Sequence, residues 1–369
     1  MKLQKRIISS VLIFVLFLST NTIIGAEKSF EDKVMDIETR YYEYIKDNLE
    51  DIVDVDTFDN SLFRIDRNSN YDNIKIEKPF VIYLLQDTQD PILYYPLSCN
   101  NEIVLIVNIT ETTNGFCYSV SESYSEYLNE IDYLNNNCVF YNCSGVVYIE
   151  TEEDIINTLT GSNEHANLIS KESDYAKLSF NEKEKLSQNI IKDFTAKDVN
   201  VITNISTSEY IYKGDLTLYN PQGQHGRGMC WACSCATIIN YMFQKSVTGY
   251  EVCNRMSIGY DVGGTIYDEQ DALYKYGIDY SYTRNTALDK SRILQNINNE
   301  KPIIANYAIN GATIGHAVTI YGIDSYGRIN VWDSNLNNGN GASCLISNSA
   351  VYPMDDGYNY YWRQTVSYY

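Results

Sequence analysis

The sequence predicts an α+β protein with two domains, and three observations carry this prediction. The chain has 369 residues, which is enough for two ordinary domains. Hydrophobic residues make up 44% of the chain and aromatic residues 13%, so each domain can bury a core. Helical patterns and strand-like runs are grouped within each half instead of alternating, which is typical of α+β folds and not of parallel α/β folds.

The first 26 residues have the pattern of a removable export signal. Three basic residues among the first six precede the mostly apolar run Ile7–Leu18, and small residues follow before Glu27. No later segment approaches the run of about 20 apolar residues that a membrane-spanning helix needs. We therefore expect a signal peptide over residues 1–26 and a secreted protein with no membrane attachment after its removal.

Residues 27–200 predict an N-terminal α+β domain. A helical pattern covers Phe30–Leu49, and a second, polar one covers the stretch from Ser170 to Phe194. Short runs rich in Ile, Val and Tyr lie between them and predict an antiparallel sheet. These runs are Phe80–Leu85, Ile92–Pro96, Ile103–Ile109, Phe116–Val120 and Val146–Ile149. The only histidine here, His165, lies in a polar loop and is expected to be solvated, and no catalytic constellation is recognisable.

Residues 201–215 predict a linker, because they are polar and weakly patterned. The second domain, 216–369, begins with a helix whose apolar positions recur at helical spacing from Trp231 to Met242. Further helices are expected at Glu269–Tyr276 and Asp289–Asn298. After these helices we expect strands that pair in an antiparallel sheet, over Ile303–Ile309, Ala317–Ile323, Ile329–Asp333 and Tyr358–Tyr368.

The formal net charge is −20, from 48 acidic and 28 basic residues. A nucleic-acid partner is therefore not expected, because binding to phosphates needs a basic surface. The charge itself is typical of a soluble protein.

Three of the nine cysteines cluster as Cys230, Cys233 and Cys235. A zinc site is not expected, because the chain offers no second C-x-x-C pair and no pair of histidines at ligand spacing. A redox pair would need a βαβ context that is missing. A disulfide within the cluster would be strained, since a helix directs these side chains apart. An odd number of cysteines also leaves at least one thiol without a partner in the chain.

The remaining interpretation makes Cys230 a nucleophile. It follows a glycine-bearing loop and opens a helix, whose dipole favours a thiolate. A thiolate needs a base and a group that orients the base. His316, at the head of a predicted strand, is the favoured base, and His225 is the alternative. Asp333 on the next strand is expected to orient it, with Asn335 as the alternative.

These residues resemble the active-site motifs of papain-like cysteine peptidases. QHGRGMCWACS resembles the family's nucleophile motif, with Gln224 six residues before Cys230 and Trp231 after it. DVGGTIYDEQDALYKYGI resembles the segment whose glycine pair, here Gly263 and Gly264, lines the substrate cleft. GHAVTIYGID and VWDSN resemble the strands of the histidine and of the third member. The order is preserved from Gln224 to Asp333, and the resemblance covers about residues 216–369.

The resemblance implies a papain-like fold for 216–369, with helices before an antiparallel half-barrel, as in compact bacterial secreted members of the staphopain and streptopain type. Gln224 would help to hold the oxyanion, Trp231 would lie at the substrate site, and neither a metal nor a cofactor would be needed. The substrate would be a polypeptide. Residues 27–200 would be an inhibitory propeptide that is cut away within 201–215. The sequence departs from the family at Asp333, where an asparagine is usual, and at Arg227, where a cysteine is usual.

Two other functions remain compatible with these residues. A Cys-His-Asp set also serves acyltransferases and amidases, of the transglutaminase or peptidoglycan amidase type. A catalytically idle papain fold that serves in binding is the third hypothesis. Gln224 and the pair Gly263 and Gly264 favour the peptidase over the acyltransferases and amidases. The intact cysteine, histidine and glutamine argue against an idle fold.

Overall fold

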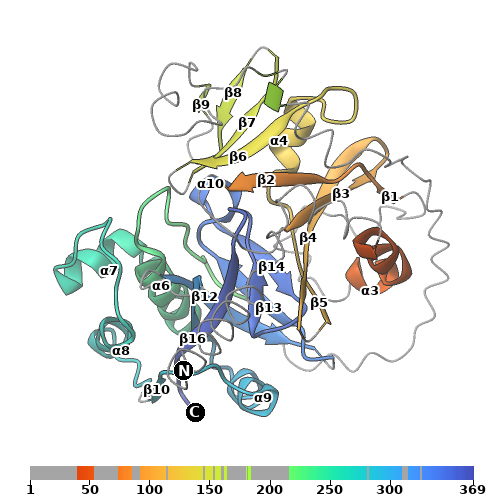
Figure 1. The fold of residues 1–369 in the computed structure, drawn as a ribbon. Helices are drawn as coiled ribbons and strands as arrows, with labels where there is room; N and C mark the ends of the chain where they lie inside the picture. The colour runs from red at the N-terminus through yellow and green to blue at the C-terminus, as the bar shows by residue number, and fades with distance from the viewer. Residues whose placement is uncertain are drawn as a thin grey trace, which may run out of the picture.

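The computed structural model describes residues 40–53, 74–84, 92–113, 115–143, 146–152, 154–158, 162–163, 180, 182–183, 216–280, 282–309, 315–324 and 326–369. Within these residues the protein is an α+β fold built on one large mixed sheet (Figure 1). The predicted signal peptide, the linker 201–215, His165 and nearly all of the helix expected from Ser170 to Phe194 lie outside the described residues.

The N-terminal region opens with helical residues 40–47 and α3 (Leu49–Ile52), which fall at the end of the helix predicted for Phe30–Leu49. All five predicted strands form, as β2 (Phe80–Leu84), β3 (Leu93–Cys99), β4 (Glu102–Thr112), β5 (Gly115–Ser121) and β7 (Val146–Glu150). Elements that the sequence patterns did not indicate are β1 (Lys75–Ile76), α4 (Ser125–Glu130), β6 (Val139–Cys143), β8 (Ile155–Asn157) and β9 (Ser162–Asn163).

The prediction of a purely antiparallel N-terminal sheet is wrong at one place, because β2 and β6 pair in parallel, with Ile82 opposite Phe140. The chain returns to β2 only after β3, β4, β5 and α4, a connection long enough to bring the second strand in with the same direction. The other strand pairs of the described sheet are antiparallel.

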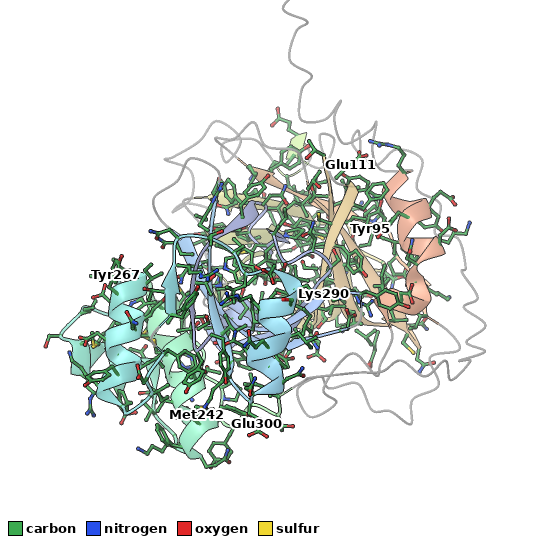
Figure 2. All side chains as sticks on the ribbon, turned by 90° about the horizontal axis from the view of Figure 1, so that it is seen from below. Tyr95, Glu111, Met242, Tyr267, Lys290 and Glu300 are labelled. Atoms are coloured by element: carbon green, nitrogen blue, oxygen red, sulfur yellow. The ribbon has the colours of Figure 1, made fainter. Side chains whose placement is uncertain are left out.

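Both faces of the N-terminal sheet are covered, which explains why its strands are apolar without strict alternation. On β3, Tyr95 lies in the core beneath the N-terminal helices (Figure 2), whereas its neighbour Tyr94 points to the opposite core, which includes Leu128 of α4 and Ile149 of β7. Successive side chains of a strand point to opposite faces, so each of these tyrosines fills one core.

The C-terminal region has most of its helices before most of its strands, as predicted. The helices are α6 (Cys230–Phe243), α7 (Gly249–Met256), α8 (Ile266–Lys275), α9 (Lys290–Asn298) and the short α10 (Leu336–Gly339). The strands are β10 (Tyr282–Arg284), β11 (Ile303–Ile309), β12 (Gly315–Ile323), β13 (Ile329–Asp333), β14 (Ala342–Ile346), β15 (Val351–Pro353) and β16 (Asn359–Ser367). The exceptions to the predicted order are the short strand β10, which precedes α9, and the short helix α10, which follows β13.

Two helix starts are set by capping boxes. Thr248 and Glu251 cap α7, a helix that the apolar pattern did not indicate. Thr265 and Asp268 cap α8, so this helix begins at Ile266, three residues before the predicted start. In each box the threonine hydroxyl and the acidic side chain satisfy backbone N–H groups that have no partner within the helix. The spacing S/T-x-x-D/E was the sequence signal for both boundaries.

The C-terminal strands separate two cores. On β11, Ile304 faces the core made with α6, α7 and α8, whereas Ile303 and Ala305 face the core that contains Ile293 and Ile297 of α9. Successive side chains of the strand therefore point into different cores, with α6, α7 and α8 on one face and α9 on the other.

The two regions share one sheet. Strand β5 of the N-terminal region pairs with β14, with Val120 opposite Leu345 and Ser119 opposite Ile346. Leu345 belongs to the N-terminal core. The strand order is β10-β16-β11-β12-β13-β14-β5-β4-β3-β2-β6-β7-β8-β9, with β1 and β15 paired off this path. The N-terminal region thus covers the edge that β14 would otherwise expose. In the described part of the chain no helix is long and apolar enough to cross a membrane.

Candidate active site

Cys230 is the first residue of α6, and the loop before it sets its position. His225 and Gly226 both have positive φ, of 50° and 71°, which turns the chain sharply towards the helix. The preceding residue, Met229, makes no side-chain cap, so the first N–H groups of α6 remain available to a negative charge. Cys230 is partly exposed, whereas the next ten residues of the helix, 231–240, are buried.

Trp231 packs beneath the segment of Gly263 and Gly264, which is predicted to line the substrate cleft. Its side chain is only 1% exposed, and its Nε1 donates a hydrogen bond to the carbonyl oxygen of Val262 at 3.1 Å. Gly264 lies directly on the indole, because a Cβ atom at that position would be 2.4 Å from Trp231 Cδ2. Next to it, Gly263 borders open space, with no atom within 4 Å of its Cβ position. The open side of this segment is therefore at Gly263, and Trp231 supports it from within.

Replacing Gly264 with alanine is expected to destabilise the protein by about 1–3 kcal/mol, because the buried indole cannot move away from the new methyl group. The measurement is the free energy of unfolding from urea titration. Gly263→Ala is the matched control, since the same methyl group there meets open space. Equal stability of the two variants would contradict the packing described here.

His316 and Asp333 are in direct contact. His316 is the second residue of β12 and Asp333 is the last residue of β13, which pairs with β12. The distance from His316 Nε2 to Asp333 Oδ1 is 2.7 Å. His316 also lies close enough to Cys230 to lower the pKa of its thiol, and the backbone N–H of Ala317 donates to Cys230 Sγ at 3.4 Å. Three residues of three different elements thus form one connected set.

Asp333 is fully buried and has a donor for each carboxylate oxygen. Besides His316, Oδ1 accepts a hydrogen bond from the backbone N–H of Asn335 at 2.8 Å. Oδ2 accepts from the hydroxyl of Tyr352 at 2.9 Å. Of the two candidates for the orienting residue, the structure therefore places Asp333 against the histidine, and Asn335 contributes only its backbone to this carboxylate.

The charges of the three groups support one another. Burial alone would raise the pKa of the Cys230 thiol, but the hydrogen bond and charge of His316 and the N–H groups of Ala317 and Trp231 lower it below its ordinary value. Burial alone would lower the pKa of His316, but Asp333 and then Cys230 raise it well above its ordinary value. Burial would likewise raise the pKa of Asp333, and His316 outweighs it, so that this pKa is lowered. The arrangement favours a thiolate beside an imidazolium.

Gln224 lies next to the segment that follows Asp333. Its Nε2 donates to Asn335 Oδ1 at 2.8 Å, and its Oε1 accepts from the Ser334 hydroxyl at 3.0 Å. Its backbone N–H also donates to the carbonyl oxygen of Ser334. The amide carries two N–H donors, so one remains beyond the bond to Asn335. His225, the alternative base, has its backbone N–H bound to the carbonyl oxygen of Gly339 at 2.7 Å.

The neighbouring cysteines have a different character from Cys230. Cys233 and Cys235 are fully buried, and burial raises the pKa of both thiols. Their sulfurs donate to the backbone oxygens of Gly223 and Glu269. The eight cysteines whose side chains are described form no disulfide, and no group of metal-ligating residues was found among the described residues.

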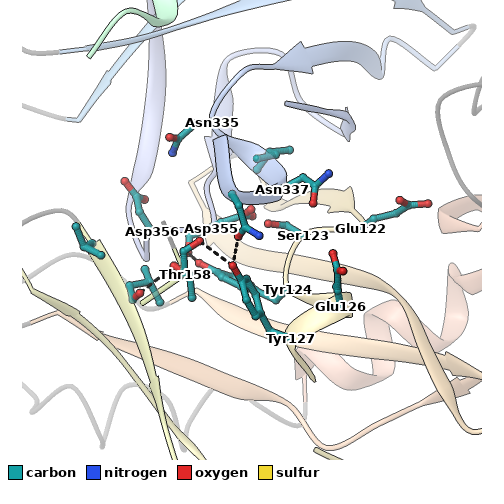
Figure 3. Close-up of a pocket in the computed structure, with 14 residues that line it drawn as sticks. Glu122, Ser123, Tyr124, Glu126, Tyr127, Thr158, Asn335, Asn337, Asp355 and Asp356 are labelled. Atoms are coloured by element: carbon teal, nitrogen blue, oxygen red, sulfur yellow. Dashed lines mark hydrogen bonds between the residues drawn. The ribbon is translucent and has the colours of Figure 1, made fainter. Parts of the chain in front are cut away.

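A pocket lies between the two regions of the chain, and none of Cys230, His316 and Asp333 lines it. Asn335 and Asp356 line it from the C-terminal region, and Tyr124 and Tyr127 line it from the N-terminal region (Figure 3). Sequence reasoning did not indicate this pocket, and it also missed Tyr352, because the local pattern around Tyr352 gives no sign of its contact with Asp333.

Comparison with known proteins concerns the C-terminal region. Residues 216–366 match the model of the Peptidase_C39 like family, which is related to the papain-like cysteine peptidases. The match confirms the resemblance that the motifs of this domain predicted, and it supports a cysteine peptidase-type function at a coarse level. It does not extend to the N-terminal region. No curated protein matches the chain.

Proposed function

We propose that residues 216–369, which contain the cysteine peptidase-type match over 216–366, are an endopeptidase that cleaves peptide bonds with Cys230, His316 and Asp333. The observation that carries the proposal is the connected set itself: a thiol bound by the N–H group of Ala317, whose pKa is lowered by the neighbouring His316, and a buried carboxylate 2.7 Å from that histidine. This combination activates a sulfur nucleophile and supplies an acid for the leaving group.

The reaction proceeds in two halves. The Cys230 thiolate forms a bond to the carbonyl carbon of the peptide, and the electron pair of the carbonyl moves to its oxygen. When the C–N bond breaks, the proton of the His316 imidazolium goes to the departing amine, and a thioester remains. A water molecule then attacks the thioester while His316 takes its proton, which releases the carboxylic acid and restores the thiolate.

The negative oxygen of the intermediate needs hydrogen-bond donors. The backbone N–H of Cys230, at the open start of α6, is one donor in this proposal. The second amide hydrogen of Gln224 is the other, held in place by the contacts of Gln224 with Ser334 and Asn335. Gly263, which borders open space, would expose its backbone to the substrate chain.

The remaining features of the chain fit an exported zymogen. Residues 1–26 would direct export, and the chain would cut itself within 201–215. This segment joins the two regions that share the sheet, since the described residues before it end at 183 and those after it begin at 216. We take a polypeptide as the substrate, with no metal or cofactor in the reaction.

Incubation of residues 27–369 with an unfolded test protein checks this function. Peptide fragments whose new ends mass spectrometry identifies, and whose formation stops after alkylation with iodoacetamide, are the expected result. A primary amine added to the same mixture separates the alternatives: incorporation of the amine without chain cleavage would indicate an acyltransferase and overturn the endopeptidase proposal.

A further inference from the structure

Tyr352 completes the surroundings of the catalytic carboxylate. Its side chain is fully buried, and its hydroxyl provides the hydrogen bond to Asp333 Oδ2 at 2.9 Å. The ring packs edge-on against Tyr307, with ring centroids 5.8 Å apart, so the hydroxyl has a fixed direction. Burial raises the pKa of Tyr352 well above its ordinary value, which keeps the hydroxyl a donor. A buried carboxylate oxygen without a donor is costly, so Asp333 depends on this contact.

The N-terminal region holds the turn that follows Tyr352. Tyr352 lies on β15, and the chain then turns through residues 354–358 into β16. Four consecutive backbone carbonyl oxygens, those of Pro353–Asp356, each accept a hydrogen bond from a side chain of the N-terminal region. The donors, in order, are Ser119 at 2.6 Å, Tyr94 at 2.7 Å, Tyr124, and Asn142 at 2.8 Å. Without that region, four buried or half-buried acceptors of the turn would lose their donors.

Further contacts attach the N-terminal region to the same side of the active site. Gly357, at the end of the turn, has a φ of +93°, and its Cβ position lies 2.6 Å from Leu84 of β2. The hydroxyl of Tyr127 donates to Asn338 Oδ1, in the segment that follows Asp333 (Figure 3). The pairing of β5 with β14 adds a further link, because β14 in turn pairs with β13, the strand that ends at Asp333.

We propose that Tyr352 is a positioning residue for Asp333, and that the N-terminal region holds Tyr352 in place and is a permanent part of the active enzyme. This inference rests on the proposed function, because it assigns Asp333 the role of orienting His316. A cut within 201–215 then produces a two-chain enzyme and not a free C-terminal peptidase. The N-terminal region acts as a support for the catalytic residues, through a continuous sheet and a clamped turn.

A double-mutant cycle tests the role of Tyr352. Tyr352→Phe is expected to lower kcat about tenfold with KM within twofold, because the hydroxyl contacts Asp333 and not the substrate. In the Asp333→Ala background the same change is expected to have no further effect on kcat, since its point of action is gone. An equal loss in both backgrounds would show a merely structural role and overturn the proposal for Tyr352.

A second pair of variants tests the clamp. Tyr94→Phe removes the hydroxyl that binds the carbonyl oxygen of Met354, and about a threefold loss of kcat is expected. Tyr133→Phe is the matched control, because its hydroxyl binds the carbonyl oxygen of Lys78 at 2.8 Å, within the N-terminal region itself. Equal activity of the two variants and the unmodified protein would overturn the coupling between the turn and the catalytic residues.

The permanence of the N-terminal region is tested on the full chain with a site-specific protease sequence placed within 201–215. After cutting, the two chains are expected to elute together in gel filtration as one active complex. Separation of the chains, with residues 216–369 as active alone as the cut complex, would overturn the proposal. In the double-mutant cycle of Tyr352 and Asp333, the alkylation rate of Cys230 is measured as well as kcat. If no peptidase activity is found, the proposed function is overturned, and the alkylation rates still decide the role of Tyr352.

Discussion

Replacing Cys230 with alanine is expected to remove peptide-bond cleavage altogether, both of an unfolded test protein and of the chain's own segment 201–215. Loss of a nucleophile typically costs about five to six orders of magnitude in kcat, because the remaining groups cannot form the acyl intermediate. The measurement is the time course of fragment formation, with the new chain ends identified by mass spectrometry. The variant should retain the stability of the unmodified protein, since the sulfur is partly exposed at the start of α6.

Cys233→Ala is the matched control for this prediction. It removes a thiol three residues along the same helix, one that is fully buried and hydrogen-bonded to the backbone oxygen of Gly223. Cleavage by this variant is expected to continue within about threefold of the unmodified rate, with some loss of stability from the small cavity. If Cys230→Ala still cut itself at the unmodified rate while Cys233→Ala did not, the nucleophile would be Cys233 and the site described here would be misassigned.

Replacing His316 with alanine is expected to remove both activity and the reactive thiolate. In the unmodified protein, His316 lowers the pKa of the Cys230 thiol, so Cys230 reacts with iodoacetamide on the acidic side of its ordinary range. Without the imidazolium, only the N–H groups of Ala317 and Trp231 oppose burial, and the pKa of the thiol rises. Each unit of that rise removes about nine-tenths of the thiolate at a fixed pH below the pKa.

The pH dependence of Cys230 alkylation shows whether removal of His316 raises the pKa of the thiol. We expect alkylation of Cys230 at pH 6 to be on the order of a hundredfold slower in the His316→Ala protein and to recover only at alkaline pH. The measurement is the alkylation rate across pH 4–10. His225→Asn is the control, because asparagine tolerates the positive φ at this position. It should leave the pH profile unchanged. A shift of the profile in His225→Asn and none in His316→Ala would make His225 the base.

Local chemistry explains why the sequence alone predicted the core of the site. A cysteine at the first turn of a helix, a histidine at the head of a strand and an aspartate at the end of the next strand are each visible in a stretch of a few residues. Their order along the chain matches that of a known family, so short patterns were enough to choose Cys230, His316 and Asp333. The choice between Asp333 and Asn335 was left open, because both lie at the end of one strand. Only the register of β12 and β13 places the carboxylate against the ring.

The long-range pairing of the sheet explains what the sequence could not provide. Nothing in the pattern of β5 indicates that it continues the sheet of the second region at β14, since an apolar strand pairs equally well with many partners. Tyr352 is one of 34 tyrosines, and its contact with Asp333 joins residues 19 positions apart, with α10 and β14 between them. The parallel pairing of β2 with β6 likewise depends on the path of the chain between them and not on either strand's composition.

The sequence by itself predicted the α+β class, most of the helices and strands of the second region, and three residues, Cys230, His316 and Asp333, that lie together in the structure. These follow from side-chain periodicity, helix ends and the acid–base character of a few residues. Only the tertiary structure decided how the two regions join, which groups surround Asp333, and that Gln224 lies against Ser334 and Asn335. Such contacts join residues far apart in the chain, and they are selected by the packing of the whole fold because no local pattern encodes them.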